Sequence, residues 1–556
     1  MNQRIPRITI DQSVLISGAI FLVVSLLTHA HLTGDGPVYV ASVVSRVSRG
    51  LAGPSYWDAG HLLWRPLAFV IATMTGAASA ASISRIFIAF SWFGAAVSSV
   101  VLPAWLRRVG VSRTAAVWSS VSMITANAVL AYYQGGSSYT ASLACLLVGL
   151  HPLSVEASRF RAIVAGLSLA AAVLLWLPFV LALPAALAAP VLLRGFARAT
   201  VRTTLWATLA CALAGAVAYG GVAVHLGIST PAQFIAWLND ASHGITKVKG
   251  LSRTVFGFAR SFLNMGADGA VLKRYLLHDP YNPVSKLDLF RHSLIKVAWF
   301  YLVLVGLVIS VWRNTRGRAL LWFFVAAFLP VLLFAIAWQG GDPERYLALY
   351  PAFLLALAFG VDDRRRLLRG VAMAFVAMCA FVNILAYSRW EFAREEARVR
   401  ARFTGFRPEL LPAGSILVST TDVDGLTAYV HSGAVGDLRA IGQFNAVGLL
   451  IPGYENATQW RSFFASKALE SWAAGGRVWV TRRAFSTQPA ADWGWVEGED
   501  PRLHWADFRQ FFASLDATSS VGGSDGFVEL PASDRNRAAL HALAIAKQVS
   551  PDADKR

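Results

Sequence analysis

Long apolar runs separated by short polar junctions make up the first two thirds of the chain. A bilayer core about 30 Å thick is crossed by a helix of about 20 apolar residues, so such runs predict transmembrane helices. The whole chain is 56% hydrophobic and only 15% charged, whereas soluble domains are about 25% charged. The predicted spans lie near residues 13–30, 85–106, 114–131, 139–153, 162–177, 179–193, 203–226, 293–312, 319–338, 346–361 and 370–388. We therefore expect an α-helical polytopic membrane protein with about eleven transmembrane helices.

Arginine clusters mark every second junction between these runs. The clusters are Arg107, Arg108 and Arg113; Arg159 and Arg161; Arg194, Arg198 and Arg202; Arg313, Arg316 and Arg318; and Arg364, Arg365, Arg366 and Arg369. The alternate junctions at 132–138 and 177–178 contain no Lys or Arg. This alternation follows the positive-inside rule and predicts a cytoplasmic N-terminus. It places the loops 32–84 and 227–292, and every residue after 389, outside the cytoplasm.

The segment 66–82 is apolar enough to span, but a span there would move the Arg107 cluster to the outer side. We therefore expect this segment to form helices that lie in, or dip into, the outer membrane interface. The basic start MNQRIPR and the run behind it are expected to be the first anchor rather than a cleaved signal. The reason is that more spans follow and no small-residue cleavage site does.

The chain divides into two unlike parts. Residues 1–389 carry 32 Lys and Arg against 12 Asp and Glu, whereas residues 390–556 carry 18 against 20. In the second part, SILVST (415–420) and RVWVTRRAF (477–485) predict strands, with helical patterns between them. We expect a transmembrane domain at 1–389 and a soluble extracytoplasmic α/β domain at 390–556. Because the net charge of +18 comes from the membrane part, where it orients the spans, it predicts no nucleic-acid partner.

The acidic residue Asp35 lies in THAHLTGDGPVYV, a few residues past the first span. The flanking glycines and Pro37 predict a tight turn around it. One interpretation is an interfacial turn residue that caps a helix beginning at Val38. The other is a carboxylate at the membrane mouth that acts as a general base or a metal ligand.

A second polar cluster lies in SYWDAGHLLWRPL (55–67), where Asp58, His61, Trp64 and Arg65 are close in sequence. One interpretation is an amphipathic interfacial helix whose Trp and Arg lie at head-group depth. The other is a sugar–phosphate site, because an acid, a histidine, an aromatic ring and an arginine suit such a ligand.

The outer loop 227–292 is unusually basic for a segment on that side of a membrane. Its candidate phosphate-binding residues are Lys247, Lys249, Arg253, Lys273 and Arg274. These charges could attract anionic lipid head groups. Alternatively, they could bind the phosphate or pyrophosphate of a lipid carrier, because arginine forks match such anions.

The last candidate site lies in QGGDPERYLALYPAFLLAL, where Arg345 and Tyr346 begin an apolar run. A helix N-terminus favours anions, so an arginine gains nothing from the helix dipole there. A bound anion would explain Arg345. Pairing with Asp342 or Glu344 is the alternative.

With these residues in place, the chain resembles the GT-C superfamily of integral membrane glycosyltransferases, which take sugars from polyprenyl-phosphate carriers. The resemblance covers about residues 10–388, and the C-terminal domain matches only in its placement. Its features, in order, are an Asp soon after the first span (GDGPVYV), a His and a Pro (GHLLWRPL), a short helical pair (AGLSLAAAVLLWLPFVLALP), and a helix start of the R-Y-L-x-x-x-x-P type (ERYLALYPAFLLALA). The resemblance implies that residues 1–389 form a GT-C-like catalytic domain.

The resemblance also implies roles for single residues. The first-loop aspartate is the main catalytic carboxylate of the family, which corresponds here to Asp35. An arginine at the start of the RYL-type helix contacts the carrier phosphate in relatives, which corresponds to Arg345. Asp58 is expected to be a second acid on proximity alone. The His–Pro element departs from the family's HPPL form, because LLWR separates His61 from Pro66, and this leaves the role of His61 open.

The implied chemistry is displacement at the anomeric carbon with inversion, in which Asp35 activates an acceptor hydroxyl or amine and the lipid phosphate leaves. We expect three partners: a polyprenyl-phosphate-linked sugar donor, membrane lipids, and a glycan, lipid or protein acceptor. Some relatives use a divalent metal and others do not. The few acids and the lack of a DxD motif in the first loop favour a site without a metal.

Three other functions stay open. A transporter or flippase for a lipid-linked or anionic substrate would carry ionisable residues near mid-membrane in repeated halves. A ligase would move a whole glycan from a lipid pyrophosphate, and a scaffold would act through the C-terminal domain. The scarcity of charge within the runs favours the transferase. Frequent arginine and the lack of eukaryotic targeting features favour a bacterial inner membrane.

Overall fold

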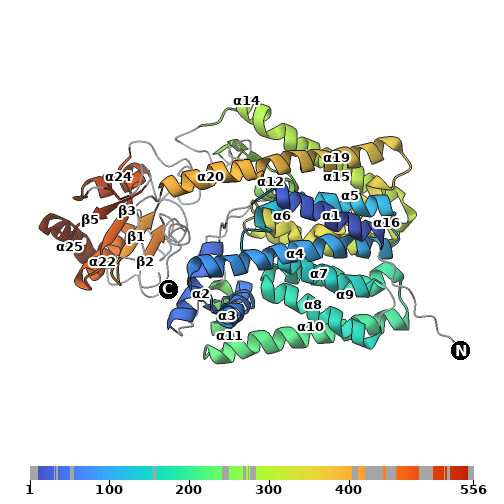
Figure 1. The fold of residues 1–556 in the computed structure, drawn as a ribbon, viewed down its shortest axis with the longest axis horizontal. Helices are drawn as coiled ribbons and strands as arrows, with labels where there is room; N and C mark the ends of the chain where they lie inside the picture. The colour runs from blue at the N-terminus through green and yellow to red at the C-terminus, as the bar shows by residue number, and fades with distance from the viewer. Residues whose placement is uncertain are drawn as a thin grey trace.

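The computed structural model describes residues 11–29, 32, 35–49, 56–154, 158–240, 250–266, 271–272, 274–275, 283–402, 411–419, 442–445, 459–486, 505–518, 520–521 and 526–548. Within these ranges, the membrane part is a bundle of helices that run roughly along the long axis of the molecule (Figure 1). The C-terminal domain lies at one end of this bundle, which we call the outer end. The first helix, α1 (Gln12–Leu27), begins at the opposite end (Figure 1).

The predicted apolar runs all coincide with helices. In chain order these are α1, α4 (Ala80–Arg108), α5 (Arg113–Ile124) with α6 (Asn127–Tyr132), α7 (Tyr139–Leu153), α8 (Arg159–Leu175), the 3-10 helix η3 (Leu177–Ala182) with α9 (Leu183–Arg194), α10 (Arg198–His225), α15 (Ile295–Arg313), α17 (Leu321–Ala337), the 3-10 helix η5 (Pro343–Leu349) with α18 (Tyr350–Val361), and α19 (Arg366–Ala386). Among the described residues, six helical segments are by themselves long and apolar enough to cross a membrane. The prediction of a polytopic helical protein is therefore confirmed.

Side-chain caps explain where several of these helices begin. Asp11 accepts a hydrogen bond from the backbone N–H of Ser13 at the start of α1. Ser79, Ser112 and Ser158 do the same for α4, α5 and α8. Each cap satisfies one of the amide groups that a helix N-terminus leaves without an intrahelical partner.

Short helices occupy the outer end of the bundle. They are α2 (Gly36–Arg49), α3 (Trp64–Thr75), α11 (Pro231–Asp240), α12 (Leu251–Phe262) and α14 (Lys286–Leu289) (Figure 1). The segment 66–82 is not one continuous helix, because α3 ends at Thr75 and α4 begins at Ala80. The 12 residues of α3 rise only about 18 Å, which is less than the thickness of a bilayer core.

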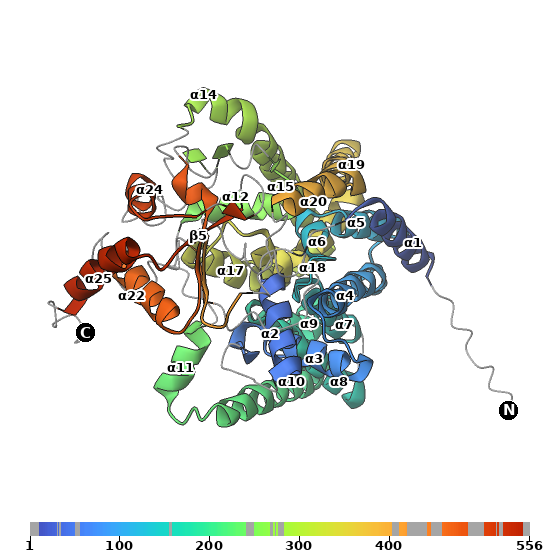
Figure 2. The same cartoon turned by 60° about the vertical axis from the view of Figure 1, so that its left-hand side comes forward.

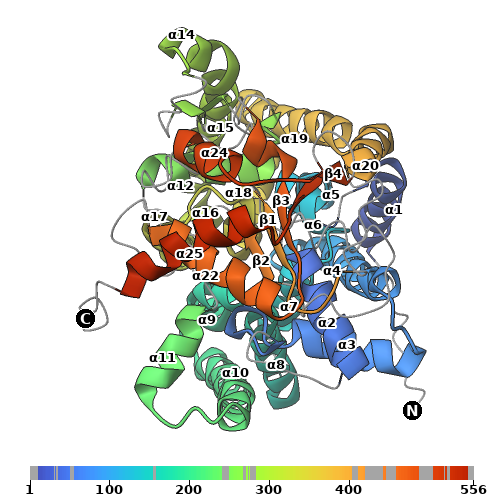
Figure 3. The same ribbon diagram turned by 90° about the vertical axis from the view of Figure 1, so that its left-hand side faces the viewer.

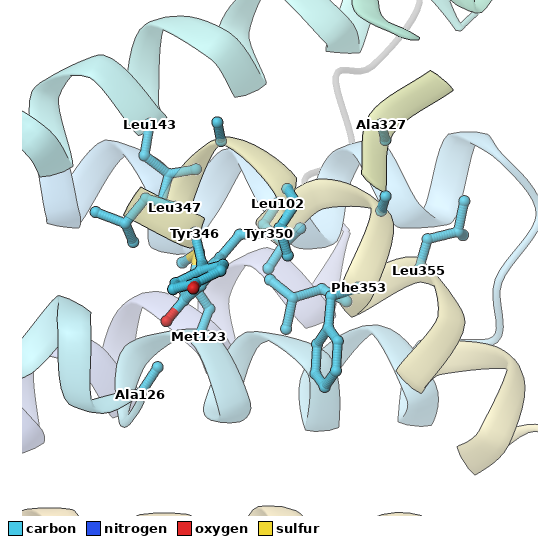
Figure 4. Close-up of a cluster of buried hydrophobic side chains, with 14 of the residues drawn as sticks. Leu102, Met123, Ala126, Leu143, Ala327, Tyr346, Leu347, Tyr350, Phe353 and Leu355 are labelled. Atoms are coloured by element: carbon cyan, nitrogen blue, oxygen red, sulfur yellow. The ribbon is translucent and has the colours of Figure 1, made fainter. Parts of the chain in front are cut away.

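The centre of the bundle is the segment Pro343–Val361, which comprises η5 and α18 and whose apolar part is 89% buried inside the protein. Figure 4 shows Tyr346, Tyr350 and Phe353 stacked along this segment among aliphatic side chains from neighbouring helices. A helix that is apolar on all sides can lie in lipid or inside a protein. In this segment other helices cover nearly all of the apolar surface. The η5–α18 segment is therefore held rigidly, and the residues at its outer end are fixed with it.

The C-terminal domain contains a five-stranded sheet in the order β2-β1-β3-β5-β4. The strands are β1 (Ile416–Ser419), β2 (Gly442–Asn445), β3 (Val478–Thr481), β4 (Ser520–Val521) and β5 (Phe527–Leu530). The pairs β2–β1 and β1–β3 are parallel, and β3–β5 and β5–β4 are antiparallel. Helices α22 (Gln459–Ala473), α24 (Trp505–Ala513) and α25 (Asp534–Gln548) accompany the sheet (Figure 3).

Both predicted strands are present. β1 (Ile416–Ser419) lies within the predicted strand 415–420, and the predicted strand 477–485 contains β3 (Val478–Thr481) followed by a 3-10 turn at Arg482–Phe485. The helix α20 (Arg389–Arg402) continues from the end of α19 towards this domain (Figure 1). The prediction of a helical membrane part followed by an α/β domain is confirmed.

Candidate active site

Asp35 immediately precedes α2 and is half-buried. The backbone N–H of Tyr39 donates to the carbonyl oxygen of Asp35 at 3.0 Å, and the Tyr39 hydroxyl donates to Oδ2 of Asp35 at 3.2 Å. Burial raises the pKa of Tyr39 well above its ordinary value, so the phenol stays protonated and can donate this hydrogen bond. A Cβ at Gly36 would lie 2.9 Å from the carbonyl oxygen of Gly135, so glycine allows α2 to begin against the turn 133–138. The local structure therefore fixes the backbone and one oxygen of Asp35.

Asp58 and Arg65 form a buried ion pair. Their charged atoms are 3.5 Å apart, and their side chains are 4% and 1% exposed. Asp58 also accepts a hydrogen bond from the N–H of Gly60, and the Arg65 guanidinium lies 4.8 Å from the centre of the Tyr39 ring. The predicted amphipathic helix with Trp64 and Arg65 at head-group depth is wrong. Both residues are buried because Trp64 donates to a backbone carbonyl of the turn 133–138 and Arg65 is paired with Asp58.

His61 is a buried link between three segments. Its Nδ1 lies 2.8 Å from Oγ of Ser138 and 3.1 Å from the carbonyl oxygen of Leu175. Its ring lies 5.3 Å from that of Tyr39 and 6.0 Å from that of Tyr139. His61 therefore packs against Tyr39 and helps to hold that ring in place.

Arg345 lies in η5 between two tryptophan rings. Its Cζ is 4.8 Å from the centre of the Trp338 ring and 5.9 Å from that of Trp176. Its Nη2 donates to the side chain of Gln339 at 2.8 Å and lies 3.9 Å from the Asp342 carboxylate. The side chain is 13% exposed, and its buried Nε has no hydrogen-bond acceptor among the described residues. Arg345 therefore keeps donor capacity for a ligand.

The turn before Arg345 holds an unusual backbone conformation. Gln339 has a φ of 47°, and among the described residues it is the non-glycine residue with positive φ. Such a conformation costs about 1 to 3 kcal/mol and persists where the surroundings impose it. The hydroxyl of Tyr346 donates to the carbonyl oxygens of Gly340 and Thr254 and thereby ties this turn to α12. Tyr346 is completely buried, so it positions the turn and does not reach a ligand.

Tyr139 connects the Asp35 and Arg345 parts of the site. The Tyr139 ring lies 6.0 Å from that of His61, whose ring lies 5.3 Å from that of Tyr39, the tyrosine that donates to Asp35. The Tyr139 ring lies 4.6 Å from that of Trp176, which in turn faces Arg345. A carboxylate and a guanidinium therefore share one aromatic wall at the outer end of the bundle.

Glu344 is a buried carboxylate that the sequence did not single out as a site residue. The hydroxyl of Tyr132 donates to its Oε2 at 2.7 Å, and the Tyr132 ring meets Tyr139 edge-on at 4.8 Å. The partners come from a segment about 210 residues earlier in the chain, so no local pattern could reveal them. The strained Gln339 was also missed, although the glycine pair behind it is a sign of an irregular turn.

Part of the predicted basic surface lies near this turn. Arg253 and Arg274 are half-buried, and Arg253 belongs to α12, which packs against η5. Arg260, on the same helix, points Nη1 at the carbonyl oxygen of Gly341, 3.4 Å away. The predicted residues Lys247, Lys249 and Lys273 lie outside the described residues.

Within the described ranges, no group of three or more His, Cys, Asp or Glu side chains comes close enough together to hold a metal ion. The free cysteines Cys145, Cys211 and Cys379 lie on helices of the bundle, and Cys145 packs against the cluster that contains Tyr39 and Trp64.

No family model matches the sequence, and no curated protein matches it. Among solved structures, the chain is similar to ArnT from Cupriavidus metallidurans in the apo state, with a TM-score of 0.51 and 12% identity over 95% of this chain and 98% of that chain. For ArnT bound to undecaprenyl phosphate the TM-score is 0.50, with 13% identity over 94% and 99%. The apo oligosaccharyltransferase of Archaeoglobus fulgidus has a TM-score of 0.49 and 14% identity over 94% of this chain and 74% of that chain. The likeness to ArnT shows that the chain shares the overall fold of that protein, and a membrane fold of this kind is what the GT-C-like motifs led us to expect.

Proposed function

We propose that the chain is a glycosyltransferase that moves a sugar from a polyprenyl-phosphate carrier to an acceptor at the outer face of a membrane. One observation carries this proposal. The half-buried carboxylate of Asp35 and the largely buried guanidinium of Arg345 are connected by one series of ring contacts, through Tyr39, His61, Tyr139 and Trp176. Arg345 also has an Nε without an acceptor among the described residues. A base on one side and an anion-binding group on the other are the two groups that transfer from a lipid phosphate requires.

In the proposed reaction, an acceptor hydroxyl attacks the anomeric carbon of the sugar from the face opposite the phosphate. A new bond forms between the acceptor oxygen and the anomeric carbon. The bond between that carbon and the phosphate oxygen breaks, and its electron pair stays on the phosphate oxygen. The acceptor proton passes to Asp35, and the polyprenyl phosphate leaves with an additional negative charge. Arg345 stabilises this charge through its free donor, because a fork of N–H groups suits phosphate oxygens. One displacement inverts the configuration at the anomeric carbon.

The donor class is supported by the ArnT structure that contains undecaprenyl phosphate, because that protein has the same fold. The chain is an integral membrane protein, and we propose a bacterial inner membrane with the N-terminus in the cytoplasm and the C-terminal domain outside. The arginine clusters support this orientation, since they mark the end of the bundle opposite the C-terminal domain.

The position of the buried charged groups supports surface chemistry over transport. Asp58, Arg65 and Glu344 all lie at the outer end, in or next to η5, α3 and the 3-10 helix η2 (Ala59–His61). A transporter for an anionic substrate would place such groups near the middle of the membrane on broken helices.

The test uses purified full-length protein with a panel of polyprenyl-phosphate-linked hexoses and pentoses as donors. Asp35→Asn should lower transfer by at least about 100-fold, because a general base contributes about 10²- to 10⁴-fold. The same variant should still bind undecaprenyl phosphate, measured as a rise in melting temperature in detergent. Arg345→Ala should lose that rise, whereas Arg313→Ala, an exposed arginine at the opposite end of the bundle, should keep it. Full transfer by Asp35→Asn would refute the role of the base. Unchanged lipid binding by Arg345→Ala would refute the phosphate site.

A further inference from the structure

Helix α2, which begins directly after Asp35, is enclosed on all sides. Every residue from Tyr39 to Ser45 is at most 6% exposed. Because a helix turns about 100° per residue, seven consecutive residues face every direction around its axis. Helices α3 and α4 pack against α2 and cover part of this surface. Another element must therefore cover the rest.

The C-terminal sheet supplies part of the remaining cover. Leu417 on β1, Trp479 on β3 and Phe527 on β5 belong to the same buried cluster as Tyr39 and the valines of α2. Figures 2 and 3 both show the sheet beside α2.

The opposite face of the sheet is covered differently. Side chains alternate along a strand, and the neighbouring residues Val418, Val480 and Leu530 pack against α22, α24 and α25. The sheet therefore has one face in its own domain core and one face on the helix that follows Asp35.

The start of α20, the helix that leads to the C-terminal domain, contacts the chain on the other side of Asp35. Thr28, at the end of α1, pairs with Ser388 just before α20, and the N–H of His29 donates to the carbonyl oxygen of Tyr387 at 2.9 Å. The His29 ring is stacked on Phe392 of α20 with 4.0 Å between the ring centres. Asp35 thus lies in the chain between a contact with the start of the connecting helix α20 and a contact with the C-terminal sheet.

We propose that the C-terminal domain positions Asp35 for reaction by holding α2 in place. Leu417, Trp479 and Phe527 are positioning residues in this proposal, and Tyr39 links them to the carboxylate because it both belongs to the cluster and donates to Asp35 Oδ2. The consequence for catalysis rests on the proposed function. The consequence for the structure of α2 does not.

The test measures hydrogen exchange of the Tyr39 amide, whose acceptor is the Asp35 carbonyl, together with transfer kinetics in the full-length protein. Leu417→Ala and Trp479→Ala should each raise the exchange rate of this amide at least about tenfold, because they loosen local packing. They should also lower kcat by about tenfold or more with little change in the donor KM, because a small displacement of a catalytic group is costly. Val418→Ala is the matched control, since it is a buried neighbour on the other face of the same strand. It should leave both quantities near their wild-type values.

Unchanged exchange at Tyr39 in both docking-face variants would overturn the proposal. A raised exchange rate with wild-type kcat would also overturn it, because α2 would then move without affecting the reaction. The milder variant Leu417→Val should change the exchange rate and kcat in the same directions by smaller factors. It replaces the alanine variants in the test if those do not fold. If the wild-type protein transfers no sugar from any donor, the proposed function fails, and the exchange comparison still decides whether the sheet holds α2 and the Asp35 backbone.

Discussion

Replacing Asp58 by asparagine separates a structural role for this carboxylate from a catalytic one. The charges of Asp58 and Arg65 are 3.5 Å apart, and both side chains are almost completely buried. At an effective dielectric constant of about 20, two unit charges at this distance attract each other by about 5 kcal/mol. Removing one partner returns part of the desolvation energy but leaves the other charge buried, so the net loss of stability is about 3 to 5 kcal/mol. We therefore expect Asp58→Asn to be a strongly destabilised protein.

The assay is thermal unfolding in detergent, combined with transfer activity per folded molecule. Asp58→Asn should melt well below the wild type, and the molecules that remain folded should retain most of their activity. The double variant Asp58→Asn/Arg65→Met should regain much of the lost stability, because no unpaired charge then remains in the protein interior. A wild-type melting temperature together with a loss of transfer of about 100-fold would refute this reasoning and would make Asp58 the second catalytic acid.

Two further predictions concern the turn beside Arg345 and the inner end of α1. Gly257→Ala should lower donor binding more than stability, because a Cβ there would overlap the carbonyl oxygen of Gly340 and push the turn out of place; lipid-induced stabilisation checks this. Hydrogen bonds from Ser13, followed by interactions with Arg107, lower the pKa of Asp11 to about 2 from its ordinary value of 3.8. This contribution to stability is present above pH 4 and lost as the pH falls from 4 to 2, so Asp11→Asn should flatten that part of a stability–pH curve.

The spans could be predicted because the bilayer imposes a simple rule on the sequence. A spanning helix must be apolar over about 20 residues and must satisfy its own backbone groups, and both requirements are visible locally. The arginine clusters then predicted which end of each span faces the cytoplasm. The segment 66–82 was harder, because α3 buries Ala68 and Ala72 against its neighbours while Leu67, Val70 and Met74 stay exposed on a helix too short to cross the membrane.

The site could be predicted only where its residues lie close to a sequence landmark. Asp35 follows the first span, and Arg345 begins an apolar run, so both could be proposed before the structure was known. The partners that define their surroundings come from distant segments, as Tyr132 does for Glu344 and Trp176 does for Arg345. The interfacial interpretation of Trp64 failed for the same reason, because the carbonyl group that buries it belongs to the turn after α6.

The structure also explains why Asp35, and not Asp58, suits the role of the base. A base must present a lone pair to an incoming acceptor, and Asp35 is half-buried with Oδ2 bonded to Tyr39. One carboxylate oxygen of Asp58 accepts a hydrogen bond from the N–H of Gly60, and the other faces the Arg65 guanidinium. Only 4% of the Asp58 side chain is exposed. Protonating Asp58 would also leave Arg65 as a buried charge without its counterion, which is energetically costly. Two carboxylates that are close in sequence therefore have different capacities because their environments differ. The same ion pair supports the ring that donates to Asp35, so the structural carboxylate stabilises the surroundings of the proposed catalytic one.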